Sequence, residues 1–399
     1  MRELAVVTVV LAALAGQPAS GQRIKLSASL ADLEKAARSD SNDAAAHYNV
    51  ALAYWNAKRW DDADSALHRA TRMDPQFAAA FMALAGLPYA RRPQLYEEDY
   101  ENRVPIEWKP EVEESERMYR RAVMIDPLVE ARIGYVLLPE ETSRRLLVVM
   151  VMLQGVDWVG DYFHGIDLYF QGKYEDSYVR FQRVMNAIKA ERHGGRVWNT
   201  LLYWHGLAAG QTRNFDDAVL DFENLLARYL DTEKSKEDST LQIPLRTNEF
   251  RYILAVMKQR AGKFNEAIAL YREALQNDIG LYMAHVRLAQ IHEASNMFAQ
   301  AVAERRAAVS ANPEDASLLL DLGKTLARAG RWPDAEQALQ DAVSANPRDP
   351  RPRYYLGIVH QQQNKMAEAR TAFTEFIALA PSRYGPQVAD AKQRLNALQ

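Results

Sequence analysis

The sequence predicts an all-α fold, an α-solenoid superhelix built from stacked helix–turn–helix repeats. Two observations carry this prediction. Four alanines lie 34 residues apart: Ala267, Ala301, Ala335 and Ala369. Three prolines keep the same period: Pro313, Pro347 and Pro381. A fixed period of this length is typical of repeats made of two helices, each of which packs only on its neighbours.

Length, charge and cysteine content narrow the classes of function. The chain has 399 residues, which a repeat array accommodates without a single large core. Its formal net charge of -3 argues against nucleic-acid binding, which requires a strong basic excess. The lack of cysteine excludes disulfides, thiolate metal sites and cysteine nucleophiles.

Residues 1–21 are predicted to be a signal peptide. An uncharged apolar run extends from Leu4 to Ala15, which is the length of a secretory h-region and too short to span a bilayer. The run ends in an A-x-A cleavage motif at 13–15, and a weaker motif follows at 19–21. Export to a bacterial periplasm or medium is therefore expected, with an uncleaved membrane anchor as the alternative. No later apolar run reaches spanning length, so we expect no integral membrane span after signal removal.

The unit from 316 to 347 illustrates the repeat. Leu322 and Leu326 recur at helical spacing in a first helix, and Gly330 provides the left-handed residue that ends it. A second helix presents three small or apolar residues on one face: Ala335, Leu339 and Ala342. Pro347 closes the unit because proline cannot continue a helix interior. This pattern resembles the tetratricopeptide repeat, whose small, aromatic and proline positions it matches in spacing.

The same frame divides the chain into eight repeats with caps and interruptions. The predicted segments are a capping half-repeat at 22–43, repeats 1–2 at 44–127 with an insertion at 89–110, an irregular helical connector at 128–157, repeats 3–4 at 158–230, a polar loop at 231–247, repeats 5–8 at 248–381 and a capping helix at 382–399. We expect the aromatic insertion to be ordered on the array and the charged loop to be flexible.

The resemblance implies a groove lined by the first helix of each repeat, whose fifth position often faces a ligand. Six aromatic residues are predicted to form a partner-binding stripe there: Tyr48, Trp55, Tyr162, Tyr169, Tyr203 and Tyr252. Aromatic side chains are favoured anchors at protein interfaces. The alternative is that these rings pack neighbouring repeats together. The lysine and asparagine pairs of the family's carboxylate clamp are missing, because Lys324 and Asn49 have no matching partners.

One cluster raises the question of a metal site. His164 and His205 occupy the same position in neighbouring repeats, with Asp161 and Asp157 one and two turns before His164. Imidazole and carboxylate would suit zinc or manganese. We favour the structural interpretation, in which two partly buried histidines hydrogen-bond to carboxylates, and predict no metal. No catalytic motif occurs in the sequence, so we predict no enzyme activity and no cofactor.

The predicted function is an exported scaffold that binds a partner protein or peptide in its concave groove, within a cell-envelope assembly. The alternative is a membrane-tethered accessory subunit of an envelope enzyme complex, held by the uncleaved N-terminus. A third hypothesis is an enzyme whose site lies in the irregular region 89–157. The fold prediction is specific, but repeat arrays of this kind serve many partners. The sequence leaves the partner and the oligomeric state open.

We expect the mature protein to begin near Gly16 or Gln22, because the apolar run ends in small residues that suit signal peptidase. Mass spectrometry of the N-terminal peptide from native protein would check this. Intact Met1 on protein recovered from the membrane pellet would instead support the anchor.

Overall fold

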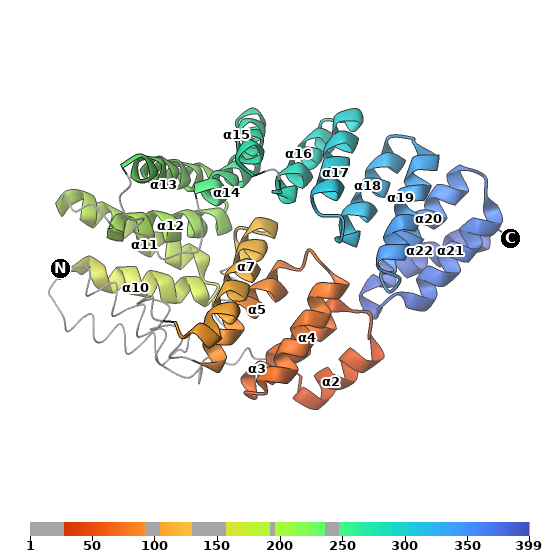
Figure 1. The fold of residues 1–399 in the computed structure, drawn as a ribbon, viewed down its shortest axis with the longest axis horizontal. Coiled ribbons are helices and arrows are strands. Elements are labelled where there is room, and N and C mark those ends of the chain that lie inside the picture. Colours follow the sequence, from red (N-terminus) through yellow and green to blue (C-terminus); the bar gives the residue numbers. More distant parts are fainter. Residues whose placement is uncertain are drawn as a thin grey trace. The chain divides into compact units, whose positions relative to one another are not determined.

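The computed structural model describes residues 28–92, 104–129, 157–191, 196–235, 247–278 and 280–398. Within these ranges the chain forms eighteen α-helices and two short 3₁₀ helices, and no strand (Figure 1). The all-α prediction is therefore confirmed. The predicted signal peptide and most of the predicted connector lie outside the described residues.

The chain divides into two compact units. The described part of unit 1 comprises 54–64 and most of 78–270. Its helices are α5 (Ala78–Arg91), η1 (Ile106–Trp108), α7 (Lys109–Ile125), α10 (Asp157–Phe170), α11 (Tyr174–Glu191), α12 (Arg196–Gln211), α13 (Phe215–Ser235), α14 (Thr247–Arg260) and the first half of α15 (Phe264–Asn277).

Unit 2 combines two stretches from opposite parts of the chain, 28–53 with 65–77 and 271–399. It contains α2 (Leu30–Ser39), most of α3 (Ala44–Asn56) and α4 (Trp60–Met73), then α16 (Tyr282–Ala294), α17 (Phe298–Ala311), α18 (Ala316–Arg328), α19 (Trp332–Ala345), α20 (Arg351–Gln362), α21 (Met366–Leu379), η2 (Ser382–Tyr384) and α22 (Gly385–Ala397).

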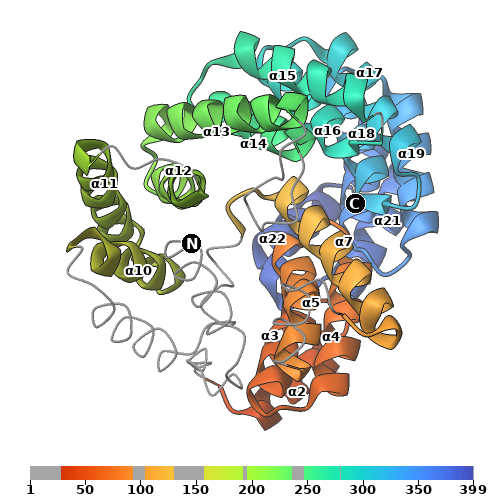
Figure 2. The same cartoon turned by 60° about the vertical axis from the view of Figure 1, so that its left-hand side comes forward.

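Successive helices pack as pairs, as a helix–turn–helix array requires. The closest packing joins α5 to α7, α10 to α11, α12 to α13, α16 to α17, α18 to α19 and α20 to α21 (Figures 1 and 2). The second helix of one pair then packs on the first helix of the next, as α17 does on α18. The predicted stack of helix–turn–helix repeats is thus the observed architecture.

Glycine in the first helix sets how closely the two helices of a repeat approach. In four repeats such a glycine lies against a large side chain sixteen residues later: Gly165 with Phe181, Gly206 with Phe222, Gly323 with Leu339 and Gly357 with Phe373. A β-carbon added to Gly357 would lie 2.5 Å from Cε1 of Phe373, closer than real atoms approach. The large partner side chains are fully buried, so the glycine leaves the space that they fill.

The turn between the two helices repeats with the same period. Residues with positive φ occur 34 positions apart at Gly262, Asn296, Gly330 and Asn364. Glycine and asparagine adopt this left-handed conformation at the least cost, which explains their use at helix ends. The left-handed residue predicted at Gly330 is confirmed by its φ of 72°.

The core of repeat 316–347 matches its prediction. Leu322, Leu326 and the three predicted residues of the second helix are buried in one cluster. After the last repeat, Ala391 of α22 is buried in a cluster with residues of α21, and three apolar residues in or directly after α22 pack against this cluster: Val388, Leu395 and Leu398. These residues share the inner face of an amphipathic helix, and the polar face points to solvent.

Four helix ends extend into the predicted insertion and the predicted polar loop. Helix α5 continues through Pro88 to Arg91, and α7 begins at Lys109, so both enter the predicted insertion 89–110. The Arg92 guanidinium lies 5.3 Å from the ring centre of Trp108, which joins the two ends of this segment. Helix α13 runs to Ser235, and α14 begins at Thr247, at the edges of the predicted polar loop 231–247.

We expect Gly357→Ala to lower the free energy of unfolding by about 1–3 kcal/mol, because the added methyl group must displace the buried ring of Phe373. Urea unfolding of the full chain would measure it. The control is Gly385→Ala at the start of α22, where an added β-carbon meets nothing within 4 Å. Equal stability of the two variants would contradict the packing argument.

Candidate functional site

The six predicted stripe residues are mostly buried. Five side chains have low exposed fractions: Trp55 3%, Tyr162 8%, Tyr169 0%, Tyr203 1% and Tyr252 0%. Tyr48 is partly exposed, and burial raises the pKa of its hydroxyl. The fold thus uses these rings for packing within and between repeats. Their role in partner binding stays a prediction.

The fifth-position tyrosines contact aromatic rings of the second helix in their own repeat. The ring of Tyr162 lies 6.1 Å from that of Phe181, and the ring of Tyr203 lies 6.2 Å from that of Phe222, both edge to face. Tyr203 also meets Phe250 of the following first helix at 6.4 Å. Edge-to-face geometry of this kind adds to the stability gained by burial.

The hydroxyls of Tyr203 and Tyr252 share a second feature, because both meet α7. The Tyr252 hydroxyl donates to the backbone carbonyl of Met124 at 2.7 Å, and the Tyr203 hydroxyl lies 3.3 Å from that of Tyr119. All these residues belong to unit 1. Figure 1 shows the carboxyl end of α7 beside α14. The first helices of two consecutive repeats therefore bind the end of an earlier helix.

We call this surface the α12–α14 face. It is formed by six residues: Tyr203, Gly210, Gln211, Tyr252, Met257 and Arg260. The Gln211 amide donates to the Leu128 carbonyl at 3.0 Å, and the Arg260 guanidinium lies 3.4 Å from the Asp126 carboxylate. An added β-carbon on Gly210 would lie 3.1 Å from Leu128 Cδ2 and 3.3 Å from Met257 Sδ. Glycine therefore leaves room for the leucine side chain.

The chain that covers this face ends α7 in a compact turn. The Leu128 amide donates to the Asp126 side chain at 3.1 Å, and the Val129 amide donates to the Asp126 carbonyl at 3.0 Å. Such a turn is the usual behaviour of aspartate before proline at the end of a helix. Leu128 is 2% exposed and Val129 is 1% exposed.

Sequence reasoning missed this contact. It joins residues that are separated by 83 to 134 positions. Repeat spacing relates only neighbouring units, so it carries no signal for a contact between repeat 2 and repeats 4 and 5. Of the residues on this face, the sequence predicted only Tyr203 and Tyr252, from their position in the repeat.

The structure places His205 in a buried polar cluster. Its Nδ1–H donates to Asp221, and the Gln182 amide donates to its Nε2 at 2.9 Å. The ring of Tyr178 stacks on the imidazole with centres 5.0 Å apart. Both ring nitrogens of His205 have hydrogen-bond partners within the protein. The imidazole of His205 therefore contacts a carboxylate and an amide group.

The proposed metal cluster also contains two aspartates, Asp161 and Asp157. Asp161 forms an ion pair with Arg180, and the side chain of Asp157 lies outside what the structure describes. Among the described residues, no group of three or more histidine, aspartate and glutamate side chains is arranged to hold a metal ion.

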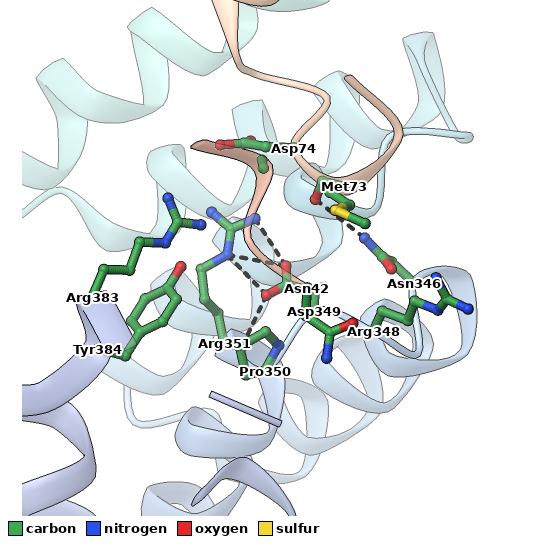
Figure 3. Close-up of a pocket in the computed structure, with 11 residues that line it drawn as sticks. Asn42, Met73, Asp74, Asn346, Arg348, Asp349, Pro350, Arg351, Arg383 and Tyr384 are labelled. Atoms are coloured by element: carbon green, nitrogen blue, oxygen red, sulfur yellow. Dashed lines mark hydrogen bonds and ion pairs between the residues drawn. The ribbon is translucent and has the colours of Figure 1, made fainter. Parts of the chain in front are cut away.

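A small cavity lies within unit 2, where the first repeat meets the last ones (Figure 3). Its lining comes from the turn before α3 and the first residue of that helix, from the end of α4, from the segment between α19 and α20, and from η2. The enclosed volume is about 10 Å³, which is the space of about one water molecule.

Polar contacts around this cavity join the two stretches of unit 2. The Asn346 amide donates to the Met73 carbonyl at 3.3 Å, and Arg383 lies 3.1 Å from Asp43. Arg351 forms two hydrogen bonds of 3.0 Å with Asp349 (Figure 3). Burial alone would lower the pKa of the Arg351 guanidinium, but the Asp349 carboxylate outweighs it and raises this pKa. The guanidinium thus remains charged in this junction.

Comparison with known proteins identifies the repeats. The sequence profile of the tetratricopeptide repeat matches residues 25–64, 203–282, 254–316, 283–350 and 320–384. No curated protein sequence matches the chain.

Several solved structures match this chain at low sequence identity. The C-terminal part of a TPR repeat-containing protein from Cytophaga hutchinsonii is 11% identical, with a TM-score of 0.46 over 58% of this chain and 85% of that one. Yeast Tom70 is 14% identical, with a TM-score of 0.39 over 92% and 91%. The TPR2AB domain of yeast Sti1 in complex with pHSP90 is 12% identical, with a TM-score of 0.28 over 61% and 99%. Because the profile matches cover more than half of the chain, it belongs to the tetratricopeptide-repeat family.

Proposed function

We propose that this protein is an exported, non-catalytic scaffold that binds a segment of a partner protein through the first helices of successive repeats, within a cell-envelope assembly. Tetratricopeptide repeats bind protein or peptide partners as a family. The observation that carries the proposal for this chain is the α12–α14 face, which already holds polypeptide through two backbone carbonyls. Side chains that donate hydrogen bonds to the backbone carbonyls of one segment can donate them equally to the carbonyls of a partner segment.

Export rests on the apolar run at the N-terminus of the sequence, which lies outside the described residues. None of the helices that the structure describes is long and apolar enough to cross a membrane. The alternative remains a membrane-tethered accessory subunit of an envelope enzyme complex, and the N-terminal residue of the mature protein separates the two.

The third hypothesis, an enzyme in region 89–157, has gained no support from the described part of that region. Its residues 104–129 form η1, α7 and the turn that covers the α12–α14 face. These residues bind other parts of the chain, and we keep the scaffold as the proposed function.

Site-specific photo-cross-linking in the native host tests partner binding by the first helices. We expect a photoreactive residue at Tyr48 or Trp204, both partly exposed on first helices, to form cross-links to another polypeptide. The matched controls are Val179 and Leu220, which are 47% and 56% exposed on second helices. Mass spectrometry would identify the cross-linked partner.

Cross-links from the second-helix positions alone would contradict the proposal, because they would place the partner on the other side of the repeats. The simultaneous replacement of Tyr162, Tyr203 and Tyr252 by alanine is a weaker test. Truncating each buried aromatic costs about 3–5 kcal/mol, so the triple variant is expected to unfold before binding is measured.

A further inference from the structure

We propose that the α12–α14 face is a docking site for a short segment with an acidic residue two positions before an aliphatic one, and that residues 124–129 of this chain occupy it as an intramolecular competitor. The inference rests on the proposed function. It adds the chemistry of the bound segment and names the occupant that a partner must displace.

The contact between residues 124–129 and the α12–α14 face is not a consequence of repeat stacking. Helix α7 is the second helix of repeat 2 and packs along α5. Its end nevertheless binds α12 and α14, the first helices of repeats 4 and 5. In a solenoid each repeat packs on its immediate neighbours. A contact that skips a repeat is better described as a segment bound to a surface.

Two contacts to the bound segment are independent of its sequence. Tyr252 and Gln211 donate to the carbonyls of Met124 and Leu128 at 2.7 and 3.0 Å. Every residue of a polypeptide has such an acceptor. The two donors therefore fix the position of a segment, whichever side chains it carries.

Two other contacts select side chains. Arg260 lies 3.4 Å from Asp126, and an arginine favours a carboxylate over a neutral group at this position. The Leu128 side chain is 2% exposed and lies over Gly210, beside Met257. This space suits an aliphatic side chain and would leave a polar one without partners. The segment is therefore recognised as acidic–any–aliphatic.

Residues 124–129 are a strong competitor because they belong to the same chain as the face. A segment on the same chain is present at an effective concentration of about 1 mM, whereas a partner arrives from dilute solution. A partner in solution can bind only those molecules in which residues 124–129 have left the face. Its apparent affinity therefore depends on how firmly Asp126 and Leu128 hold the face.

The test uses the full chain and a fluorescein-labelled synthetic peptide of residues 119–129, titrated by fluorescence anisotropy. We expect the double variant Asp126→Ala/Leu128→Ala to bind the peptide at least about tenfold more tightly than the wild type, because its own segment no longer competes. Adding Arg260→Ala to this variant, or the two alanines to the peptide, is expected to reverse the gain.

The matched control is Asp278→Ala. Asp278 makes the same kind of turn after α15, where it accepts from the Gly280 amide at 2.9 Å. The loss of the Asp278 carboxylate should weaken that turn and leave peptide binding as in the wild type. A gain with this control equal to that of the double variant would mean that loosening any turn exposes the peptide site, and would overturn the proposal.

A second experiment covers the case in which the double variant does not fold. The chain has no cysteine, so Gly210→Cys/Leu128→Cys introduces one defined pair at a contact seen here. We expect this pair to form a disulfide and the oxidised protein to lose peptide binding, which a reductant restores. Failure to form the disulfide, or equal binding before and after reduction, overturns the proposal.

The outcomes also separate this inference from the proposed function. If the peptide tests fail while cross-links from Tyr48 or Trp204 persist, the scaffold function stands and the competitor does not. If the cross-links are absent while the peptide tests succeed, the face binds residues 124–129 of this chain, and the proposed partner binding by the first helices fails.

Discussion

The close approach of the two helices within each repeat is the constraint on which the rest of the structure depends. In four repeats a glycine of the first helix faces a large side chain of the second, as Gly357 faces Phe373. Only a residue without a side chain leaves this space, and the ring that fills it is fully buried. A left-handed residue in the turn, exemplified by Gly330, then reverses the chain between the two helices. Stacking of nearly identical pairs follows.

The first helices carry polar groups that contact a segment of an earlier repeat. In unit 1 these are the hydroxyls of Tyr203 and Tyr252 and the side chains of Gln211 and Arg260. The end of α7 and the turn after it satisfy them. Buried hydroxyls require hydrogen-bond partners, and α7 supplies them for both tyrosines.

Polar contacts also join the distant stretches of unit 2. The ion pair of Arg383 with Asp43 and the hydrogen bond from Asn346 to Met73 connect the first repeat to the last ones. A single hydrogen bond contributes about 0.5–1.5 kcal/mol to stability, and an exposed ion pair contributes about 0–1 kcal/mol. The repeats themselves are stabilised by buried apolar clusters, such as the one around Leu339. Each contact between distant repeats is therefore weak beside the packing within a repeat.

The sequence by itself determined the helix pairs, their period, the family and the core of each repeat, since these depend on contacts between residues less than one period apart. Leu326 and Ala335 are examples, and both are buried as the spacing predicts. It also found Tyr203 and Tyr252 through their place in the repeat. Only the tertiary structure decided what covers these tyrosines, and it turned His205 toward Asp221. A contact between Met124 and Tyr252 spans several repeats and leaves no mark on a local pattern, because its position depends on how all the intervening helices stack.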